Sequence, residues 1–451
     1  MRFSQFYNTA RCCPTRASLL TGLFPHQTGI GQMTNSPTKQ PYQDWGTEGY
    51  MGYLNQKCVT IAEALQSNGY HTYMAGKWHL GYHEQERWPR QRGFDKFYGI
   101  ISGASSYFWP NGKRGLTYMN EALPAPDSTS YYTTDAFTDY ALQFIKEQAD
   151  DAPYFLYLAY TAPHWPLHAR EEDIARFVGK YQQGWDQLRR DRHQRQVEMG
   201  LLPDQGISLR DDRVRPWEEL SPEEQELVDY RMAVYAAQIY AVDYNIGRLT
   251  GQLAAQGELD NTLILFLSDN GGCAEMYDEL GTKPQSWINR ANFGGAVSYG
   301  IGWANASNTP FRGYKVKTLE GGISTPLIAH WPAQIKEQQG KITDHRSYLI
   351  DIMPTILDLA EADYPDQINQ VPIHPLEGKS LLSVLKTGQG EAHPYMYWEH
   401  QNNCAIRKGD WKAVKVLPDT NWQLYNLAED RIEANNIAVQ HPELVQELNE
   451  K

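Results

Sequence analysis

Three residues near the start of the chain have a spacing that suits the chemistry of an anion or a nucleophile. Cys12, Pro14 and Arg16 stand two residues apart, and the run Leu19-Leu20-Thr21-Gly22 follows them. Pro14 suits the first turn of a helix, because its ring fixes φ and it has no N–H to leave unpaired. The start of a helix is partly positive, and Arg16 adds a fixed cation. Two interpretations are open: a reactive thiolate at Cys12, or the commoner buried, inert cysteine.

A lysine and a histidine follow the next predicted strand, Tyr70–Gly76. Lys77 and His79 are two residues apart, so in extended backbone they share one side. The end of a strand is where open α/β sheets place the groups that bind ligands. Alone, such a pair is more often a solvated lysine and a structural histidine.

Polar residues also follow two apolar runs that predict buried strands, 153–160 and 261–267. After the first run, His164 lies between Pro163 and Pro166, which hold it rigidly. After the second run, Asp269 and Asn270 offer carboxylate and amide oxygens, which suit a hard cation. The alternative for this pair is an Asx turn at the end of the strand.

Four blocks, in this order, resemble the signatures of the type I sulfatases, the formylglycine-dependent, arylsulfatase-like members of the alkaline phosphatase superfamily. The first is Cys-x-Pro-x-Arg with Leu-Leu-Thr-Gly, at 12–22. The second is Gly-Tyr-x-Thr followed by Gly-Lys-Trp-His, ending at His79. The third is Leu-Ser-Asp-Asn-Gly-Gly at 267–272. The fourth places Lys315 five residues before Glu320-Gly321-Gly322.

The resemblance implies a modified cysteine, a metal site and a set of catalytic residues. Cys12, not Cys13, would be converted to formylglycine by a formylglycine-generating enzyme. The metal would be calcium, with magnesium as the alternative, held by Asp269, Asn270 and the modified Cys12. The catalytic residues would be Cys12, Arg16, Lys77, His79, His164 and Lys315.

The reaction implied is hydrolysis of a sulfate monoester, either an aryl sulfate or a carbohydrate sulfate. The formylglycine hydrate would attack sulfur, positioned by the metal and Arg16. Lys77, Lys315 and His164 would neutralise the sulfate oxygens, and Lys315 or His164 would protonate the leaving alcohol. His79 would then take a proton from the second hydroxyl, which expels sulfate and restores the aldehyde.

Several other polar residues are weaker candidates for the same site. His168 follows His164 closely and would only shape the pocket. Lys317 is the alternative to Lys315. Glu399, His400 and Asn403, near the C-terminus, are further candidates that could reach the substrate cleft.

The order of predicted elements indicates an α/β fold with a large, mixed, mainly parallel sheet and helices on both faces. Strands are predicted over 1–7, 70–76, 153–160, 261–267 and 327–331. Helices are predicted from Cys12 to about Gly22 and over 60–68, 131–148, 227–253 and 351–361. From about residue 388 short strands indicate a small antiparallel sheet, followed by a helix from Pro442. We therefore expect a catalytic domain over 1–387 and a C-terminal subdomain over 388–451.

The sequence departs from the family's pattern in one place. Sulfatases begin with a buried strand that ends in two aspartates, ahead of the cysteine, and these complete the calcium site. Neither Asp150-Asp151 nor Asp211-Asp212 follows a buried strand, so neither pair would replace them. Calcium prefers about six to eight oxygen ligands. If the chain begins at Met1, we expect weak metal binding and poor activity, and a truncated chain or a misplaced start would explain the pattern.

The composition narrows the classes of partner that we expect the protein to bind. The net charge of −13 argues against nucleic acid. No apolar run approaches the roughly 20 residues of a membrane span, and the first residues lack the apolar segment of a signal peptide. The resemblance nevertheless implies a periplasmic or secreted protein acting on a sulfated small molecule or glycan. Two alternatives stay open: a phosphate or phosphonate ester hydrolase, and a catalytically dead, sulfatase-like binding protein.

Overall fold

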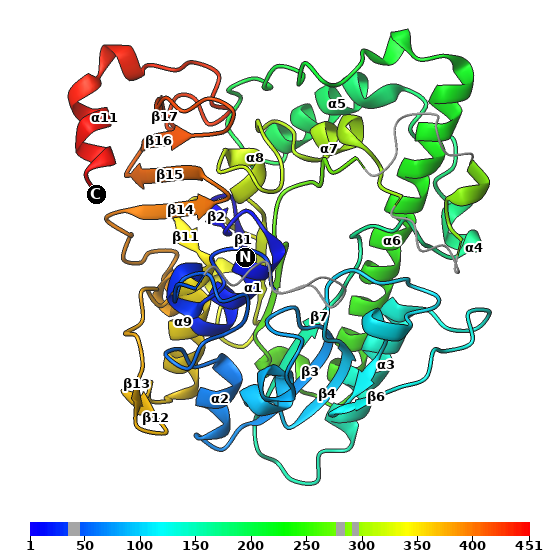
Figure 1. Ribbon diagram of the computed structural model, residues 1–451, viewed down its shortest axis with the longest axis vertical. Coiled ribbons are helices and arrows are strands. Elements are labelled where there is room, and N and C mark those ends of the chain that lie inside the picture. Colours follow the sequence, from blue (N-terminus) through cyan, green and yellow to red (C-terminus); the bar gives the residue numbers. More distant parts are fainter. Residues whose placement is uncertain (35–45, 277–284, 291–296) are drawn as a thin grey trace.

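Figure 1 shows the computed structural model of the chain, which describes residues 1–34, 46–276, 285–290 and 297–451. The predicted α/β class is confirmed, with most strands of the main body in two mixed sheets. The five-stranded sheet has the order β6-β5-β4-β3-β7, in which β3 is parallel to both β4 and β7. Its strands are β3 (His71–Lys77), β4 (Lys96–Ile100), β5 (Thr117–Tyr118), β6 (Glu121–Ala122) and β7 (Tyr154–Ala159).

The second sheet of the main body has the order β10-β1-β9-β8. Strand β1 is parallel to β10 and antiparallel to β9, which is antiparallel to β8. The strands are β1 (Arg2–Phe3), β8 (Ile264–Leu267), β9 (Leu327–His330) and β10 (Ile342–Thr343). The predicted single strand over 1–7 is two strands, because the backbone of Ser4 and Gln5 bonds to Thr343 and Ser347 instead of continuing one ladder. Strand β2 (Phe6–Tyr7) consequently pairs with β11 (Ser347–Tyr348) in a separate sheet.

Helices cover both faces of the five-stranded sheet, as alternation along β3 shows. Tyr73 and Ala75 pack with Phe137 of α3 (Thr133–Lys146), whereas Met74 belongs to the cluster that includes α2 (Ile61–Gln66). In Figure 1 the long α6 (Pro222–Ala255) runs behind this sheet and α3 lies beside it. Helix α6 begins before the predicted residue 227, because Ser221 and Glu224 form a capping box around a polar first turn that hydrophobic periodicity does not detect.

The helix that carries the cysteine motif is completely buried. Helix α1 (Cys12–Thr21) ends at Gly22, whose φ of 69° suits a glycine C-cap, and it packs against α9 (Ile352–Ala360). Within the described part of the chain, no helix has the length and apolar character to cross a membrane. The other α-helices described before the C-terminal sheet are α4 (Glu171–Ile174), α5 (Gly184–Glu198), α7 (Ile301–Ser307), α8 (Glu320–Ile323) and α10 (Leu382–Thr387).

The C-terminal part forms a small antiparallel sheet with a helix, as predicted. Its strands are β14 (Met396–His400), β15 (Asn403–Lys408), β16 (Trp411–Lys415) and β17 (Gln423–Asn426), paired in chain order. Helix α11 (Pro442–Asn449) packs on this sheet through Leu448, which is buried with Ile406 and Leu424. A separate ribbon of β12 (Gln367–Ile368) and β13 (Val371–Pro372) precedes them.

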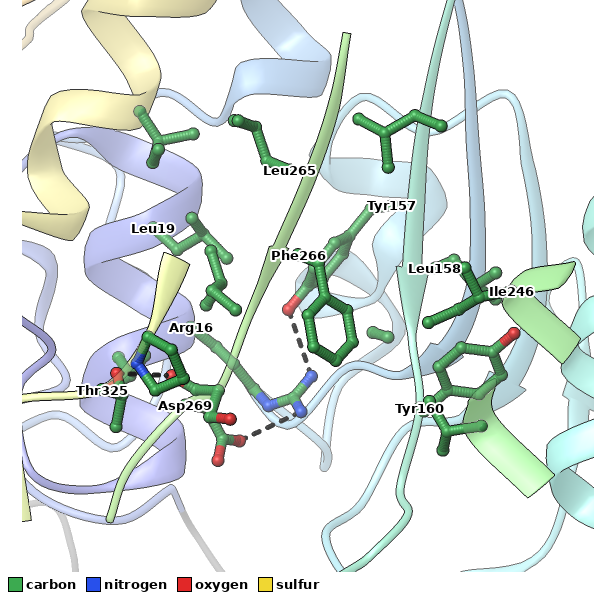
Figure 2. Close-up of a pocket in the computed structure, with 18 of the residues that line it drawn as sticks. Arg16, Leu19, Tyr157, Leu158, Tyr160, Ile246, Leu265, Phe266, Asp269 and Thr325 are labelled. Atoms are coloured by element: carbon green, nitrogen blue, oxygen red, sulfur yellow. Dashed lines mark hydrogen bonds and ion pairs between the residues drawn. The ribbon is translucent and has the colours of Figure 1, made fainter. Parts of the chain in front are cut away.

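Strands β7 and β8 were predicted to be buried, and the structure contradicts this. Both are edge strands of their sheets, and in the described residues neither has a partner on its outer edge. A cavity of about 1400 Å³ lies between them, lined also by α1 and α6 (Figure 2). Phe266 of β8 is therefore 43% exposed, although the sequence of β8 is as apolar as that of a central strand.

Candidate active site

The first turn of α1 places two thiols against one histidine. Cys12 Sγ lies 3.7 Å from Nδ1 of His79, and Cys13 Sγ lies 3.3 Å from the same atom. Both cysteines are buried. A hydrogen bond from Cys13, together with the charge of Lys77 and the hydrogen bond with His79, outweighs burial and holds the pKa of the Cys12 thiol well below its usual value. The surroundings of Cys12 therefore favour a negative charge, whereas burial raises the pKa of Cys13.

Arg16, one turn further along α1, connects three segments, and Figure 2 shows its contacts with two of them, at Tyr157 and Asp269. Its Nη1 atom donates to the Lys77 carbonyl at 2.8 Å and to the Tyr157 hydroxyl at 3.1 Å. Its Nη2 atom lies 3.1 Å from Oδ2 of Asp269. Arg16 is buried, so these bonds fix the guanidinium between the ends of β3, β7 and β8. The sequence analysis did not predict Tyr157 as a partner of Arg16, because nothing in the sequence of an apolar strand marks one tyrosine as a hydrogen-bond partner.

The end of β3 determines the positions of Lys77 and His79. Lys77 is its last residue and is buried, and burial lowers the pKa of its ammonium. His79 adopts a φ of 61°, which is uncommon for a residue other than glycine, and its N–H donates to Ile101 at 3.0 Å. Burial, reinforced by Lys77, lowers the pKa of His79 to about 4, so its imidazole is neutral at pH 7.

A glycine makes room for that imidazole. A Cβ atom at Gly103 would lie 2.9 Å from both Cε1 and Nε2 of His79, closer than real contacts of this kind. The φ of Gly103 does not itself require glycine, so the absence of a side chain serves the close approach of the ring.

His164, which follows β7, contacts Lys315, which lies 151 positions further along the chain. The Nζ atom of Lys315 lies 3.2 Å from Nε2 of His164, and Nδ1 of His164 lies 2.7 Å from the Trp165 carbonyl. A carbonyl only accepts, so Nδ1 carries the proton and Nε2 accepts from the ammonium. Burial and the charge of Lys315 lower the pKa of His164 well below its usual value. This contact therefore holds a neutral imidazole against a cation.

A carboxylate that the sequence analysis did not single out lies beside this pair. Glu275 Oε1 is 2.9 Å from Nη2 of Arg11, Oε2 is 3.8 Å from Nζ of Lys315, and the Trp165 indole donates to Oε2 at 2.9 Å. Burial alone would raise the pKa of this carboxyl, but Lys315 and Arg11 outweigh burial and hold it at about 2. Its partners come from distant parts of the chain, so spacing alone could not reveal it.

Asp269 and Asn270, the predicted metal ligands, lie directly after β8. Asp269 Oδ2 accepts from Arg16, while Asn270 Oδ1 is a buried oxygen with no hydrogen-bond partner. A buried, unpartnered amide oxygen beside a carboxylate fits a hard cation in kind. Searched over the described residues, the one compact group of three His, Cys, Asp or Glu ligands is Cys12, Cys13 and His79, whose sulfur and nitrogen donors suit softer metals.

The weaker candidates lie apart from the Lys315–His164 pair. His168 accepts from the backbone N–H of Tyr107 at 3.3 Å and packs among aromatic rings. Lys317 donates to the Leu417 carbonyl at 2.8 Å, toward the C-terminal sheet. Lys315 and not Lys317 is therefore the lysine beside His164.

The C-terminal candidates form their own contacts next to α1. Glu399 Oε2 lies 2.7 Å from Nε2 of His26, and Asn403 accepts from Lys317. His400 is fully buried with neither ring nitrogen hydrogen-bonded, and its pKa is lowered to about 4 by burial and then by Arg11. The aspartates at 150 and 211 pair with His71 and Arg213 at the surface and do not join the site.

Comparison with known proteins gives the family. The family model described as Sulfatase matches residues 1–362, and one described as N-sulphoglucosamine sulphohydrolase, C-terminal, matches residues 315–451. An uncharacterized sulfatase of Schizosaccharomyces pombe is 34% identical over 487 residues, covering 100% of this chain and 86% of its own. The arylsulfatase of Klebsiella aerogenes is 34% identical over 400 residues, covering 85% and 84%.

Among solved structures, Ps i-CgsB in complex with k-i-k-neocarrahexaose has a TM-score of 0.68 and 25% identity to this chain. The match covers 99% of this chain and 82% of that one. The likeness therefore extends over the C-terminal sheet as well as the main body.

Proposed function

The chain belongs to the sulfatase family of the alkaline phosphatase superfamily and is a sulfuric ester hydrolase, and we propose that it binds and cleaves its sulfate ester at the cluster around Cys12. The observation that carries the proposal is a set of contacts between residues from five segments. Cys12 contacts His79, Arg16 contacts Asp269, and Lys315 contacts His164. Residues so distant in the chain, brought together with the cations of Arg16 and Lys315 buried, support a common role.

The buried cations suit the binding of a sulfate group. Lys77, Lys315 and Arg16 are all less than 7% exposed, so their charges act on an anion with little screening by water. Hydrogen-bond donors held in place before the reaction stabilise charge that grows on the sulfate oxygens in the transition state. These residues therefore bind the sulfate group and lower the barrier to its transfer.

Cys12 is the position at which we propose conversion to formylglycine. When formed, that group supplies an oxygen nucleophile through its hydrate. Arg16, one turn along the same helix, and Lys77 keep the surroundings of position 12 favourable to negative charge. His79, neutral at pH 7 and 3.7 Å from the sulfur, is placed to accept a proton from the side chain at position 12.

The leaving alcohol requires a proton, and the Lys315–His164 pair is suited to provide it. Lys315 is the charged donor and His164 Nε2 accepts its hydrogen bond, so a proton can pass from Lys315 Nζ to a leaving oxygen bound beside it. Burial alone would lower the pKa of Lys315, but the neighbouring side chains of Cys273, Cys12 and Glu275 outweigh burial and raise it. The ammonium form therefore persists at neutral pH.

The metal that we propose is calcium, with magnesium as the alternative. Asp269 and Asn270 would hold it beside position 12, and a divalent cation there would supply positive charge to the nucleophile and the sulfate oxygens. The unpartnered Oδ1 of Asn270 supports this assignment.

The remaining assignments follow the family. The substrate is a sulfated small molecule or glycan, and the modifying partner is a formylglycine-generating enzyme. We divide the chain into a catalytic domain over 1–387 and a C-terminal subdomain over 388–451, consistent with the separate sheet β14–β17. The compartment typical of the family is the periplasm or the outside of the cell.

The direct test uses protein co-expressed with a formylglycine-generating enzyme and supplied with calcium and 4-nitrophenyl sulfate. Release of nitrophenol and sulfate that is lost in Arg16→Ala and Lys77→Ala would support the proposed site. Equal turnover in these variants, with the fold intact by circular dichroism, would place the reaction elsewhere.

A further inference from the structure

Glu275 lies where it can act on the charge of the substrate. Its two oxygens face different cations: Oε1 is 2.9 Å from Nη2 of Arg11, next to Cys12, and Oε2 is 3.8 Å from Nζ of Lys315. The Trp165 indole N–H donates to Oε2 at 2.9 Å and fixes the carboxylate in this position. The negative charge thus lies beside both the nucleophile's end and the leaving-group end of the proposed sulfate site.

This charge is permanent and poorly screened. The Glu275 side chain is 24% exposed, that of Arg11 is 15% exposed and that of Lys315 is 2% exposed. The pKa of about 2 keeps the carboxyl ionised throughout the neutral range. Charges this close to the interior interact more strongly than they would in bulk water.

Sulfate and phosphate monoesters are similar in size and in tetrahedral shape, but they differ in charge. A sulfate monoester carries one negative charge, whereas a phosphate monoester carries nearly two above its second pKa of about 6. Lys77, Lys315 and Arg16 would attract either ester. A repulsive element that acts on the second charge is one way for a site to discriminate between the two esters.

We infer that Glu275 is a specificity-determining residue that makes this site favour singly charged esters over doubly charged ones. It acts in two ways: it neutralises Arg11 and partly offsets Lys315, and it repels the second negative charge of a phosphate ester. This inference rests on the proposed function, because it assumes that the ester binds between Cys12 and Lys315. It places the substrate in the class of sulfate monoesters and disfavours the phosphate ester alternative.

The variant Glu275→Gln tests the inference, because it removes the charge and keeps an oxygen that accepts from Trp165. We would measure kcat/KM for 4-nitrophenyl sulfate and 4-nitrophenyl phosphate, which share one leaving group, at pH 8. The ratio of phosphate to sulfate activity should rise at least about tenfold in Glu275→Gln. The ratio should stay at the wild-type value in Glu275→Asp, which keeps the charge.

Glu63→Gln is a matched control for loss of a partly buried carboxylate. Glu63 binds Arg92 at 3.0 Å, its side chain is 20% exposed, and it caps α2 away from the Cys12 cluster. This variant should leave the ratio unchanged. A ratio that changes equally in Glu63→Gln and Glu275→Gln, or in neither, would overturn the inference.

Wild-type protein provides a measurement that does not depend on a variant's folding. The inhibition constant of phenyl phosphate, relative to the KM of the sulfate ester at the same pH, should rise at least about tenfold from pH 5 to pH 8, as the phosphate gains its second charge. No rise would overturn the inference while sulfate turnover leaves the proposed function in place. Absence of sulfate turnover in the converted wild type would overturn both.

Discussion

Lys315 Nζ lies 3.2 Å from Nε2 of His164, a contact between residues 151 positions apart in the chain. The Trp165 carbonyl fixes the tautomer of the histidine, so its free nitrogen lone pair faces the ammonium. The pair joins a base that stays neutral to an acid that stays charged. Such an arrangement suits protonation of a leaving alcohol.

Replacing Lys315 should therefore affect esters according to their leaving group. In Lys315→Ala we expect kcat for an alkyl sulfate, whose alkoxide needs a proton, to fall by roughly 10²–10⁴. The fall for 4-nitrophenyl sulfate should be much smaller, because nitrophenolate leaves without a proton. A plot of log kcat against leaving-group pKa measures this, and equal losses for both esters would show that Lys315 only binds the sulfate.

Gly103→Ala should disturb His79 without disturbing the fold. The new methyl would lie 2.9 Å from two atoms of the His79 ring and would displace it. Because a displacement of about 1 Å in a catalytic group can cost about a hundredfold in rate, we expect kcat to fall by about 10–100-fold with little change in thermal stability.

Gly251→Ala is the matched control for a glycine-to-alanine change. Gly251 lies in α6, and a Cβ atom added there would meet no atom within 4 Å. Alanine should therefore stabilise the helix by roughly 0.5–1 kcal/mol and leave kcat unchanged. Full activity in Gly103→Ala would show that the close approach to His79 has no catalytic importance.

The main members of the candidate site were selected by their resemblance to family signatures, and the structure brings these residues close together. Cys12 and Arg16 lie one turn apart on a helix, and Lys77, His164 and Asp269 each follow an apolar strand, so topology brings them to a common region. Glu275 and Gly103 could not be predicted in this way. Their roles depend on Arg11 and His79, which they meet only in the folded chain.

The fold, too, could be predicted from the sequence only in part. Element types were predicted from periodicity and caps, as for α1 and the sheet β14–β17. The predicted burial of β7 and β8 was wrong, because an apolar run shows what a strand can bury and not which strand lies beside it. The motif also selects Cys12, whereas the geometry brings both Cys12 and Cys13 to His79.

Stability should depend on pH through a buried cluster near the C-terminus. Lys412 Nζ lies 3.0 Å from Glu320 Oε1 and 2.8 Å from Glu433 Oε1, and all three side chains are 0% exposed. Burial, with repulsion from Glu320 added, outweighs Lys412 and raises the pKa of Glu433 from 4.5 to about 7. The folded state therefore binds a proton that the unfolded state has released between these pH values.

The sign of the effect follows from that proton. Because the native state binds more protons than the unfolded state between pH 4.5 and about 7, the free energy of unfolding falls as pH rises through this window. We expect a loss of up to about 3 kcal/mol between pH 5 and pH 8 in wild type, which Glu433→Gln should largely remove. Urea unfolding at both pH values tests this, and identical pH dependence in the two proteins would contradict it.

Calcium affinity should depend on Asn270. Its unpartnered Oδ1 would be a ligand, so after chelation the calcium concentration that restores half of the activity should be at least about tenfold higher in Asn270→Ala than in wild type. Asn120→Ala is the control, since Asn120 also has a buried, unpartnered Oδ1 but lies in the turn between β5 and β6. An unchanged calcium requirement in Asn270→Ala would remove Asn270 from the metal site.

The central claim is that Cys12, once converted to formylglycine, is the nucleophile of a sulfate ester hydrolase. The most direct measurement is mass spectrometry of the peptide Cys12–Arg16, alongside 4-nitrophenyl sulfate turnover, for wild type, Cys12→Ala and Cys13→Ala co-expressed with a formylglycine-generating enzyme. We predict an aldehyde at position 12, turnover in proportion to the converted fraction, loss of activity in Cys12→Ala and its persistence in Cys13→Ala. Conversion at Cys13, or undiminished turnover in Cys12→Ala, would contradict the account.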